Sequence, residues 1–194
     1  MSRFFMYSEK EAREKFLAYI NRDIGGTESE FEIKRIQLSE REDFWIIGAN
    51  AISPLHQAGG VYGYLLDADT GEVLVMGFNG PYAYLQDKYD DEEANGCSYV
   101  LSCGFESSDK EQIVNLRKKL ETSYSLAIKC VKSQNQWFCG KKRELLQLKK
   151  HFDDQDIPTK IELVEISSAM FHLDDCNGLY WWSEVVELFA SKKI

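Results

Sequence analysis

The most constraining feature of this sequence is the stretch from Val61 to Phe78. It contains two runs of apolar, β-branched and aromatic residues on either side of the polar segment Asp67–Glu72. Such runs are typical of strands, and an Asp and a Gly between them supply turn chemistry, so the stretch predicts a β-hairpin. Gly71 can adopt the positive φ that closes a short loop. A calcium loop is excluded because the sixth and twelfth residues counted from Asp67 are Glu and Phe, where Gly and Glu are needed.

The chain before the hairpin predicts one helix followed by strands. Ser8 and Glu11 form a capping-box pattern that starts an amphipathic helix, and Gly25-Gly26 ends it. The apolar alternation of residues 31–38 changes phase in its middle, which predicts a strand with a β-bulge. A denser apolar strand follows at Phe44–Ala49. We therefore expect a helix packed on an antiparallel β-meander.

The second half predicts a separate small domain after Asn95-Gly96. A strand at Tyr99–Phe105 is followed by three helices, which end before Pro158, and by a strand at Thr159–Ile166. This β-α-α-α-β order is followed by a further possible strand at Ala169–Leu173 and by a C-terminal helix from Ser183. The expected fold class is therefore α+β. The expected domains are 1–96, a helix with an antiparallel sheet, and 97–194, a small α/β domain with a C-terminal extension.

The charge distribution favours a protein partner over a nucleic acid. The net charge is −9, and residues 1–96 carry 18 acidic against 9 basic side chains, whereas residues 97–194 carry 14 of each. Phosphate backbones are repelled by such a surface, and a basic protein is attracted to it. Acidic surfaces also serve solubility alone. No apolar run is long enough for a membrane span and no signal peptide is recognised, so we expect a cytoplasmic protein without membrane contact.

The densest charge run lies on a helix that we expect to begin at Pro81. Its carboxylates could dock a basic partner, with the nearby tyrosines adding amphipathic contact area, or they could form a solvated helix end. The candidate partner-binding residues are Tyr82, Asp87, Tyr89, Asp90, Asp91, Glu92 and Glu93.

No residue is predicted to be catalytic, to bind a metal or to hold a cofactor. The five cysteines contain no Cys-x-x-Cys pair, which disfavours a zinc knuckle and a disulfide framework. His172 and Cys176 lie close together with Asp174 and Asp175 between them, so metal or thiol chemistry is the alternative to a turn with a buried cysteine. The aromatic run Tyr180–Trp182 is suited to a binding hot spot, but packing beneath the last helix is the stronger expectation.

Part of the second half resembles the C-terminal domain of the bacterial ribosomal stalk protein. The resemblance lies in the helical pattern of Ile113–Arg117, Thr122–Val131 and Glu144–Lys150 within residues 110–163. It implies a similar fold. The Gly- and Lys-rich motif of the stalk protein's factor-binding helix is missing, because Ser123–Cys130 holds one lysine and no glycine, so factor binding is not implied.

The first half resembles small immunity proteins of bacterial polymorphic toxin systems. The resemblance rests on Trp45, Ile46, Ile47 and Asn50, and on the hairpin Leu66–Val73 with its Asp-x-x-Thr-Gly-Glu-Val pattern. It implies an antitoxin that neutralises a cognate basic toxin by direct binding and needs no active site. The alternatives are a Cys/His-dependent or metal-dependent hydrolase and a non-catalytic scaffold that binds peptides or factors. The sequence indicates no oligomeric state.

Overall fold

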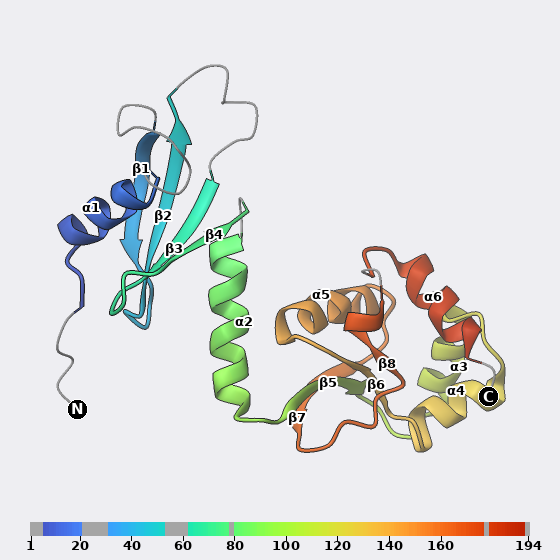
Figure 1. The fold of residues 1–194 in the computed structure, drawn as a ribbon. Helices are drawn as coiled ribbons and strands as arrows, with labels where there is room; N and C mark the ends of the chain where they lie inside the picture. The colour runs from blue at the N-terminus through green and yellow to red at the C-terminus, as the bar shows by residue number, and fades with distance from the viewer. Residues whose placement is uncertain (1–5, 21–30, 53–61, 78–79, 177–178, 193–194) are drawn as a thin grey trace. The chain divides into compact units, whose positions relative to one another are not determined.

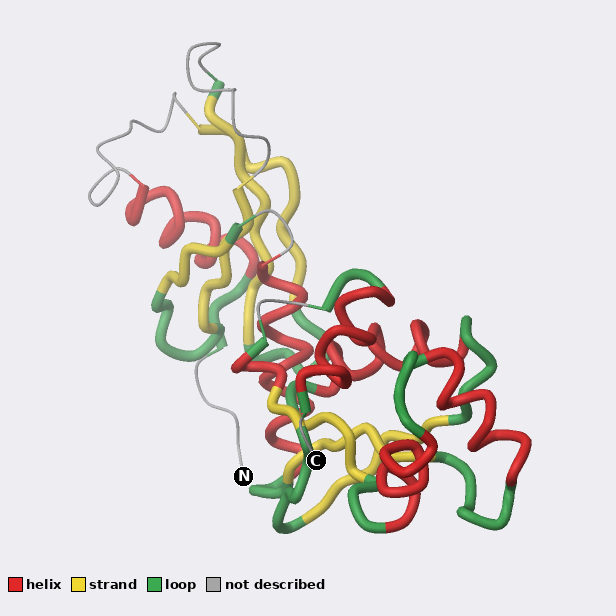
Figure 2. Tube along the Cα trace, turned by 90° about the vertical axis from the view of Figure 1, so that its right-hand side faces the viewer, coloured by secondary structure: helices red, strands yellow, loops and turns green. Residues whose placement is uncertain are grey.

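The structure is a computed structural model that describes residues 6–20, 31–52, 62–77, 80–176 and 179–192. The chain divides into two compact units, Met1–Leu85 and Gln86–Ile194. Each unit contains its own four-stranded sheet, which can be followed by label in Figure 1 and in yellow in Figure 2. The α+β class predicted from the sequence is confirmed.

The first unit is a helix on an antiparallel meander, as predicted. Its sheet follows chain order, β1-β2-β3-β4, and every neighbouring pair is antiparallel. The register of β1 against β2 shifts between Ile33 and Arg35, which confirms the predicted bulge. The elements are α1 (Glu9–Tyr19), β1 (Phe31–Leu38), β2 (Phe44–Ala51), β3 (Tyr62–Asp67), β4 (Val73–Met76) and the start of α2 (Gly80–Ala94).

The turn between β3 and β4 confirms the chemistry expected of the hairpin. The Asp67 carboxylate accepts hydrogen bonds from the backbone N–H groups of Asp69 at 3.0 Å and Thr70 at 2.7 Å. Gly71 has φ of 73°, a conformation that strains residues with a Cβ. The Asp67 carboxylate therefore stabilises the turn.

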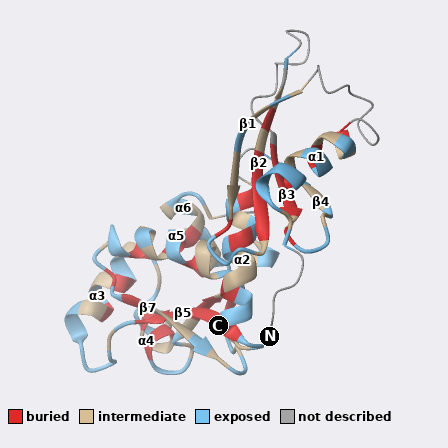
Figure 3. Cartoon of the chain, turned by 90° about the vertical axis from the view of Figure 1, so that its left-hand side faces the viewer, coloured by how far each residue is buried: buried red, intermediate tan, exposed pale blue. Residues whose placement is uncertain are grey.

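Alternation along the strands places apolar side chains on both faces of this sheet. On one face, Phe16 of α1 packs edge-on against Tyr64 with ring centroids 4.8 Å apart, and both belong to a cluster that includes Trp45. On the other face, a Cβ on Gly63 would lie 2.7 Å from Pro81 Cγ, so only glycine allows α2 to begin so close to β3. The buried residues concentrate on β2 and β3, red in Figure 3.

The second unit differs from the predicted order by one strand. Its elements after α2 are β5 (Ser98–Cys103), α3 (Lys110–Lys119), α4 (Tyr124–Lys132), β6 (Gln136–Cys139), α5 (Lys142–Asp153), β7 (Thr159–Val164), β8 (Phe171–His172), the 3-10 turn η3 (Leu173–Asp175) and α6 (Trp182–Ser191). The short strand β6 makes the order β-α-α-β-α-β, so the predicted β-α-α-α-β order is wrong. Four residues are too few for a visible alternation, and Trp137 and Phe138 are both buried, which removes the polar half of the pattern.

The sheet of the second unit has the order β7-β5-β6-β8, with β6 and β8 parallel and the other pairs antiparallel. Its core is rich in aromatic rings. Phe171 lies 5.2 Å from Phe138 and 5.2 Å from Phe189 between ring centroids, and Trp137 lies 5.2 Å from Phe152. These contacts join the strands to α5 and α6, so the C-terminal helix is part of the unit's core.

The boundary between the units falls inside α2, between Leu85 and Gln86, instead of near residue 96. Moving the boundary to this position changes how the net charge divides between the two units. Residues 1–85 carry 13 acidic and 8 basic side chains, a net charge of −5, and residues 86–194 carry 19 and 15, a net charge of −4. The acidic excess is therefore shared between the units.

Among the described residues, no helix combines the length and the apolar character needed to cross a membrane.

Candidate functional site

The first acidic residue of the predicted run, Asp87, binds the beginning of α5. Its carboxylate accepts hydrogen bonds from Arg143 Nε at 3.1 Å and Nη2 at 3.3 Å, and it lies 3.0 Å from Lys141 Nζ. Only 12% of the Asp87 side chain is exposed. Burial raises the pKa of Asp87, but the hydrogen bonds from Arg143 and Lys141 outweigh it and hold the pKa below the ordinary value.

Asp90 is buried in the same network. Its carboxylate lies 2.9 Å from Lys142 Nζ and accepts a hydrogen bond from Gln86 Nε2 at 3.0 Å. Lys142 also contacts Glu93 at 3.3 Å, and its ammonium lies 5.3 Å from the ring centroid of Tyr99. The hydrogen bond to Asp90 is the largest cause that raises the pKa of Lys142. The basic residues 141–143 therefore neutralise three carboxylates of α2.

The structure thus divides the predicted acidic run. Asp90 is buried, Asp87 is only slightly exposed, and both are held by cations at the start of α5, while Glu93 is exposed but paired with Lys142. Glu92 contacts Lys88 one helical turn earlier at 2.7 Å, and Asp91 is exposed. The partner-binding role stays a prediction for the exposed residues only.

The two tyrosines predicted with this run differ in exposure. Tyr82 is 46% exposed, and its hydroxyl accepts a hydrogen bond from Gln37 at 3.1 Å. Tyr89 is half-buried, and the Lys88 ammonium lies 5.3 Å from its ring centroid. They belong to different units, because the boundary lies between them. The structure therefore gives no ground for treating the two tyrosines as one surface.

The His172–Cys176 segment, which the sequence offers for metal or thiol chemistry, holds its thiol against the backbone. It ends β8 and forms η3, and the Cys176 thiol donates a hydrogen bond to the His172 carbonyl oxygen at 3.3 Å. Burial, and next the neighbouring charge of Asp175, raise the pKa of Cys176. Both effects favour the thiol over the nucleophilic thiolate. Within the described ranges, no group of three His, Cys, Asp or Glu side chains could hold a metal ion.

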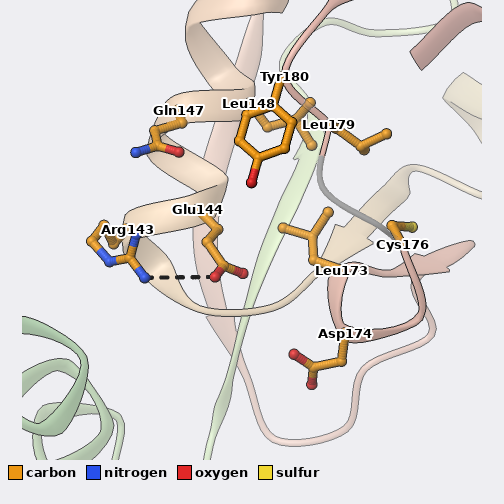
Figure 4. Close-up of a pocket in the computed structure, with 9 residues that line it drawn as sticks. All are labelled: Arg143, Glu144, Gln147, Leu148, Leu173, Asp174, Cys176, Leu179 and Tyr180. Carbon is orange, nitrogen blue, oxygen red and sulfur yellow. Dashed lines mark ion pairs between the residues drawn. The ribbon is translucent and has the colours of Figure 1, made fainter. Parts of the chain in front are cut away.

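The same segment borders a hollow of the second unit, which we call the α5 groove. It has a volume of about 480 Å³, within the range of small-ligand and side-chain pockets. Figure 4 shows helix α5 on one side and residues 173–176, 179 and 180 on the other. The lining residues are Arg143, Glu144, Gln147, Leu148, Leu173, Asp174, Cys176, Leu179 and Tyr180.

An aromatic pair, Tyr180 and Trp181, directly precedes α6, and Tyr180 lines the α5 groove. Their side chains are 70% and 69% exposed, although the sequence favoured packing them beneath the last helix. Only Trp182 follows that expectation: its ring lies 5.3 Å from Phe152, and its Nε1–H donates to the Lys119 carbonyl oxygen at 3.2 Å. The aromatic run is therefore split between surface and core.

The backbone of the exposed pair is held in place by Glu184. One carboxylate oxygen of Glu184 accepts hydrogen bonds from the N–H groups of Tyr180 at 2.7 Å and Trp181 at 2.8 Å. Glu184 is the third residue of α6, the position from which a glutamate commonly caps a helix. The spacing of Trp181 and Glu184 is the sequence signal that could have identified this anchored surface.

A second hollow adjoins the groove and adds negative charge. It has a volume of about 410 Å³ and shares Cys176 and Leu179 with the α5 groove. Its remaining lining includes Asp175, Glu184 and Glu187 and no basic residue. The surface around the aromatic pair is therefore acidic.

No known family model, curated protein or solved structure matches this chain.

Proposed function

We propose that this chain is a non-catalytic protein-binding protein of the immunity type, which neutralises a basic toxin by stoichiometric binding through Tyr180 and Trp181. The observation that carries the proposal is that both side chains are about 70% exposed while Glu184 fixes their backbone.

Exposed aromatic pairs are suited to binding because burying them in an interface removes a large apolar area from water. Tyr and Trp are also enriched among the residues that contribute most to affinity. A backbone that is already hydrogen-bonded loses less conformational entropy when the partner binds. The two hydrogen bonds to Glu184 therefore favour Tyr180 and Trp181 as preorganised anchors.

The surroundings of Cys176 favour binding over the hydrolase alternative. A cysteine nucleophile requires a thiolate that is activated by a nearby base or by positive charge. The Cys176 thiol instead donates to a backbone carbonyl, and burial raises its pKa. The scaffold alternative uses the same kind of surface, and it differs from an antitoxin in that binding does not neutralise the partner.

The test uses the protein encoded by the neighbouring gene, purified as an inactive variant and titrated into the full chain by calorimetry. We expect one-to-one binding, and we expect co-expression of the chain to protect cells from the active toxin. Tyr180→Ala and Trp181→Ala should each weaken binding by about 30-fold, because a hot-spot residue contributes about 2 kcal/mol.

Tyr124→Ala is the matched control, because Tyr124 is another exposed tyrosine of the second unit at 47% exposure. We expect this variant to bind as well as the unchanged chain. Absence of binding by the neighbouring protein would refute the proposal, and binding without protection would favour the scaffold. Equal losses for Tyr124→Ala and Tyr180→Ala would show that the aromatic pair is not the contact.

A further inference from the structure

We infer that the α5 groove receives one arginine side chain of the protein partner, with the guanidinium between Glu144 and Asp174 and the stem along the leucines that line the groove. This inference rests on the proposed function and adds the chemistry of the contact. It assigns a cation-binding role to Glu144, which the sequence did not offer as a site residue, and to Asp174, which it offered only for metal or thiol chemistry.

The interior of the groove suits the stem of a long basic side chain. Leu148 is buried at 2% exposure, and Leu173 and Leu179 are half-buried. Arg and Lys place their methylene groups along such apolar walls and keep the charged group near water. Tyr180 also lines this space (Figure 4), so an aromatic side chain is within reach of a bound cation.

The charges of the groove select a cation. Glu144 and Asp174 carry its carboxylates, and Asp175 and Glu187 line the adjoining hollow. Arg143 is the single basic residue in the lining of either hollow. It lies 3.1 Å from Asp87 through Nε but 3.6 Å from Glu144 through Nη2, so its stronger contact is with α2. Negative charge therefore remains for a ligand, and an anionic group is disfavoured.

Arginine fits this arrangement better than lysine. Its planar guanidinium can donate to two carboxylates in different directions while it stacks on an aromatic ring, whereas an ammonium is a more strongly hydrated point charge. The groove, at about 480 Å³, has room for one long side chain without a change in the walls. The structure thus points to a protruding arginine on the partner, next to the patch that contacts Trp181.

The experiment titrates N-acetyl-arginine methylamide into the isotope-labelled full chain and follows the chemical shifts by NMR. We expect saturable shifts of the Leu173 and Leu179 methyl groups and the Tyr180 ring. N-acetyl-citrulline methylamide has nearly the same shape without the charge, and it should bind at least about tenfold more weakly, because hydrogen bonds to charged groups are stronger. N-acetyl-lysine methylamide should also be weaker.

The variant Glu144→Gln/Asp174→Asn should reduce affinity for the arginine probe by about tenfold or more. The control Asp154→Asn removes an exposed carboxylate at the end of α5, away from the lining residues, and should leave affinity unchanged. Equal binding of citrulline, equal binding of lysine, an unaffected double variant or no saturable shift would each overturn the inference.

The two proposals can fail separately. Arginine binding in the groove without binding of the neighbouring gene's product would refute the proposed function. Partner binding that the double variant leaves unchanged, with no response to the arginine probe, would refute the groove inference and retain the proposed function.

Discussion

The acidic run of α2 and the aromatic pair before α6 lie in the same unit but use their side chains in opposite ways. The run is dense in charge, yet Asp87 and Asp90 are bound to basic residues at the start of α5. The pair is short, yet Tyr180 and Trp181 keep about 70% of their area exposed. Charge density in a sequence thus does not identify the surface that is left for a partner.

The difference arises from how firmly the partner groups are held. A carboxylate that is removed from water loses hydration free energy, and an ion pair offsets this loss only when the cation is held in a fixed position. Arg143 and Lys142 are fixed by α5, which packs into the core through Leu145 and Leu148. Among the described residues, the rings of the aromatic pair have no such fixed partner. Its position is determined by backbone hydrogen bonds to Glu184, which leave the rings themselves unused.

The largest expected effect separates two adjacent tryptophans. Trp182→Ala should lower the free energy of unfolding by about 3 kcal/mol, because it removes a ring packed on Phe152 and a hydrogen bond to the Lys119 carbonyl. Trp181→Ala should change it by less than about 0.5 kcal/mol, since its ring is 69% exposed. Urea denaturation of both variants measures this. A loss at Trp181 equal to that at Trp182 would contradict the division between surface and core.

The next effect compares two lysines of α5 that are equally exposed, at 31%. Lys142→Met should destabilise the unit by about 2 kcal/mol, because it leaves the buried Asp90 carboxylate without its cation. Lys149→Met should cost less than about 0.5 kcal/mol, because its partner Asp153 is half exposed. Equal costs in urea denaturation would mean that the network with α2 contributes no more than a surface ion pair.

The sequence was sufficient where local rules determine structure. The capping box at Ser8, the bulge after Ile33 and the turn at Asp67 all follow from a few neighbouring residues, and each is present. Helix α3 shows where this fails: Ser108 and Glu111 have the spacing of a capping box, but Asp109 is the cap, and its side chain accepts the hydrogen bond from Gln112 N–H. Serine and aspartate can both cap a helix, and pattern alone does not distinguish them.

The candidate site could not be predicted because it depends on distant contacts. The pairing of Asp87 with Arg143 joins residues on separate helices, and nothing near Asp87 in the sequence indicates its cation. The α5 groove likewise joins Glu144 to Leu179 and Tyr180. The sequence shows three consecutive aromatic residues at Tyr180–Trp182 and does not indicate which of them packs inward. The hydrogen bond from Trp182 to the distant Lys119 carbonyl, seen only in the structure, identifies Trp182.

A pH titration of stability sharpens the contrast between internal and surface carboxylates. The pKa of Asp87 is lowered in the folded state, so its contribution is present above the ordinary aspartate pKa and is lost as pH falls through and below about 4. Asp87→Asn should cost about 1.5 kcal/mol at pH 7 and less at about pH 2.5. Asp153→Asn is the surface control, with an expected cost below about 0.5 kcal/mol at pH 7. A cost of Asp87→Asn that is equal at both pH values would exclude the ion pair as its cause.

The smallest expected effect concerns Asp91, an exposed carboxylate of the run. If the partner contacts the aromatic pair, Asp91→Lys acts only through long-range attraction, which salt screens over about 10 Å. Its effect on affinity for the neighbouring gene's product should therefore be at most about twofold at 0.15 M salt and should disappear at 0.5 M. Tyr180→Ala should keep its loss of about 30-fold at both salt concentrations, because buried apolar contacts are not screened. A loss for Asp91→Lys of tenfold or more that persists at 0.5 M salt would return the contact surface to the acidic run.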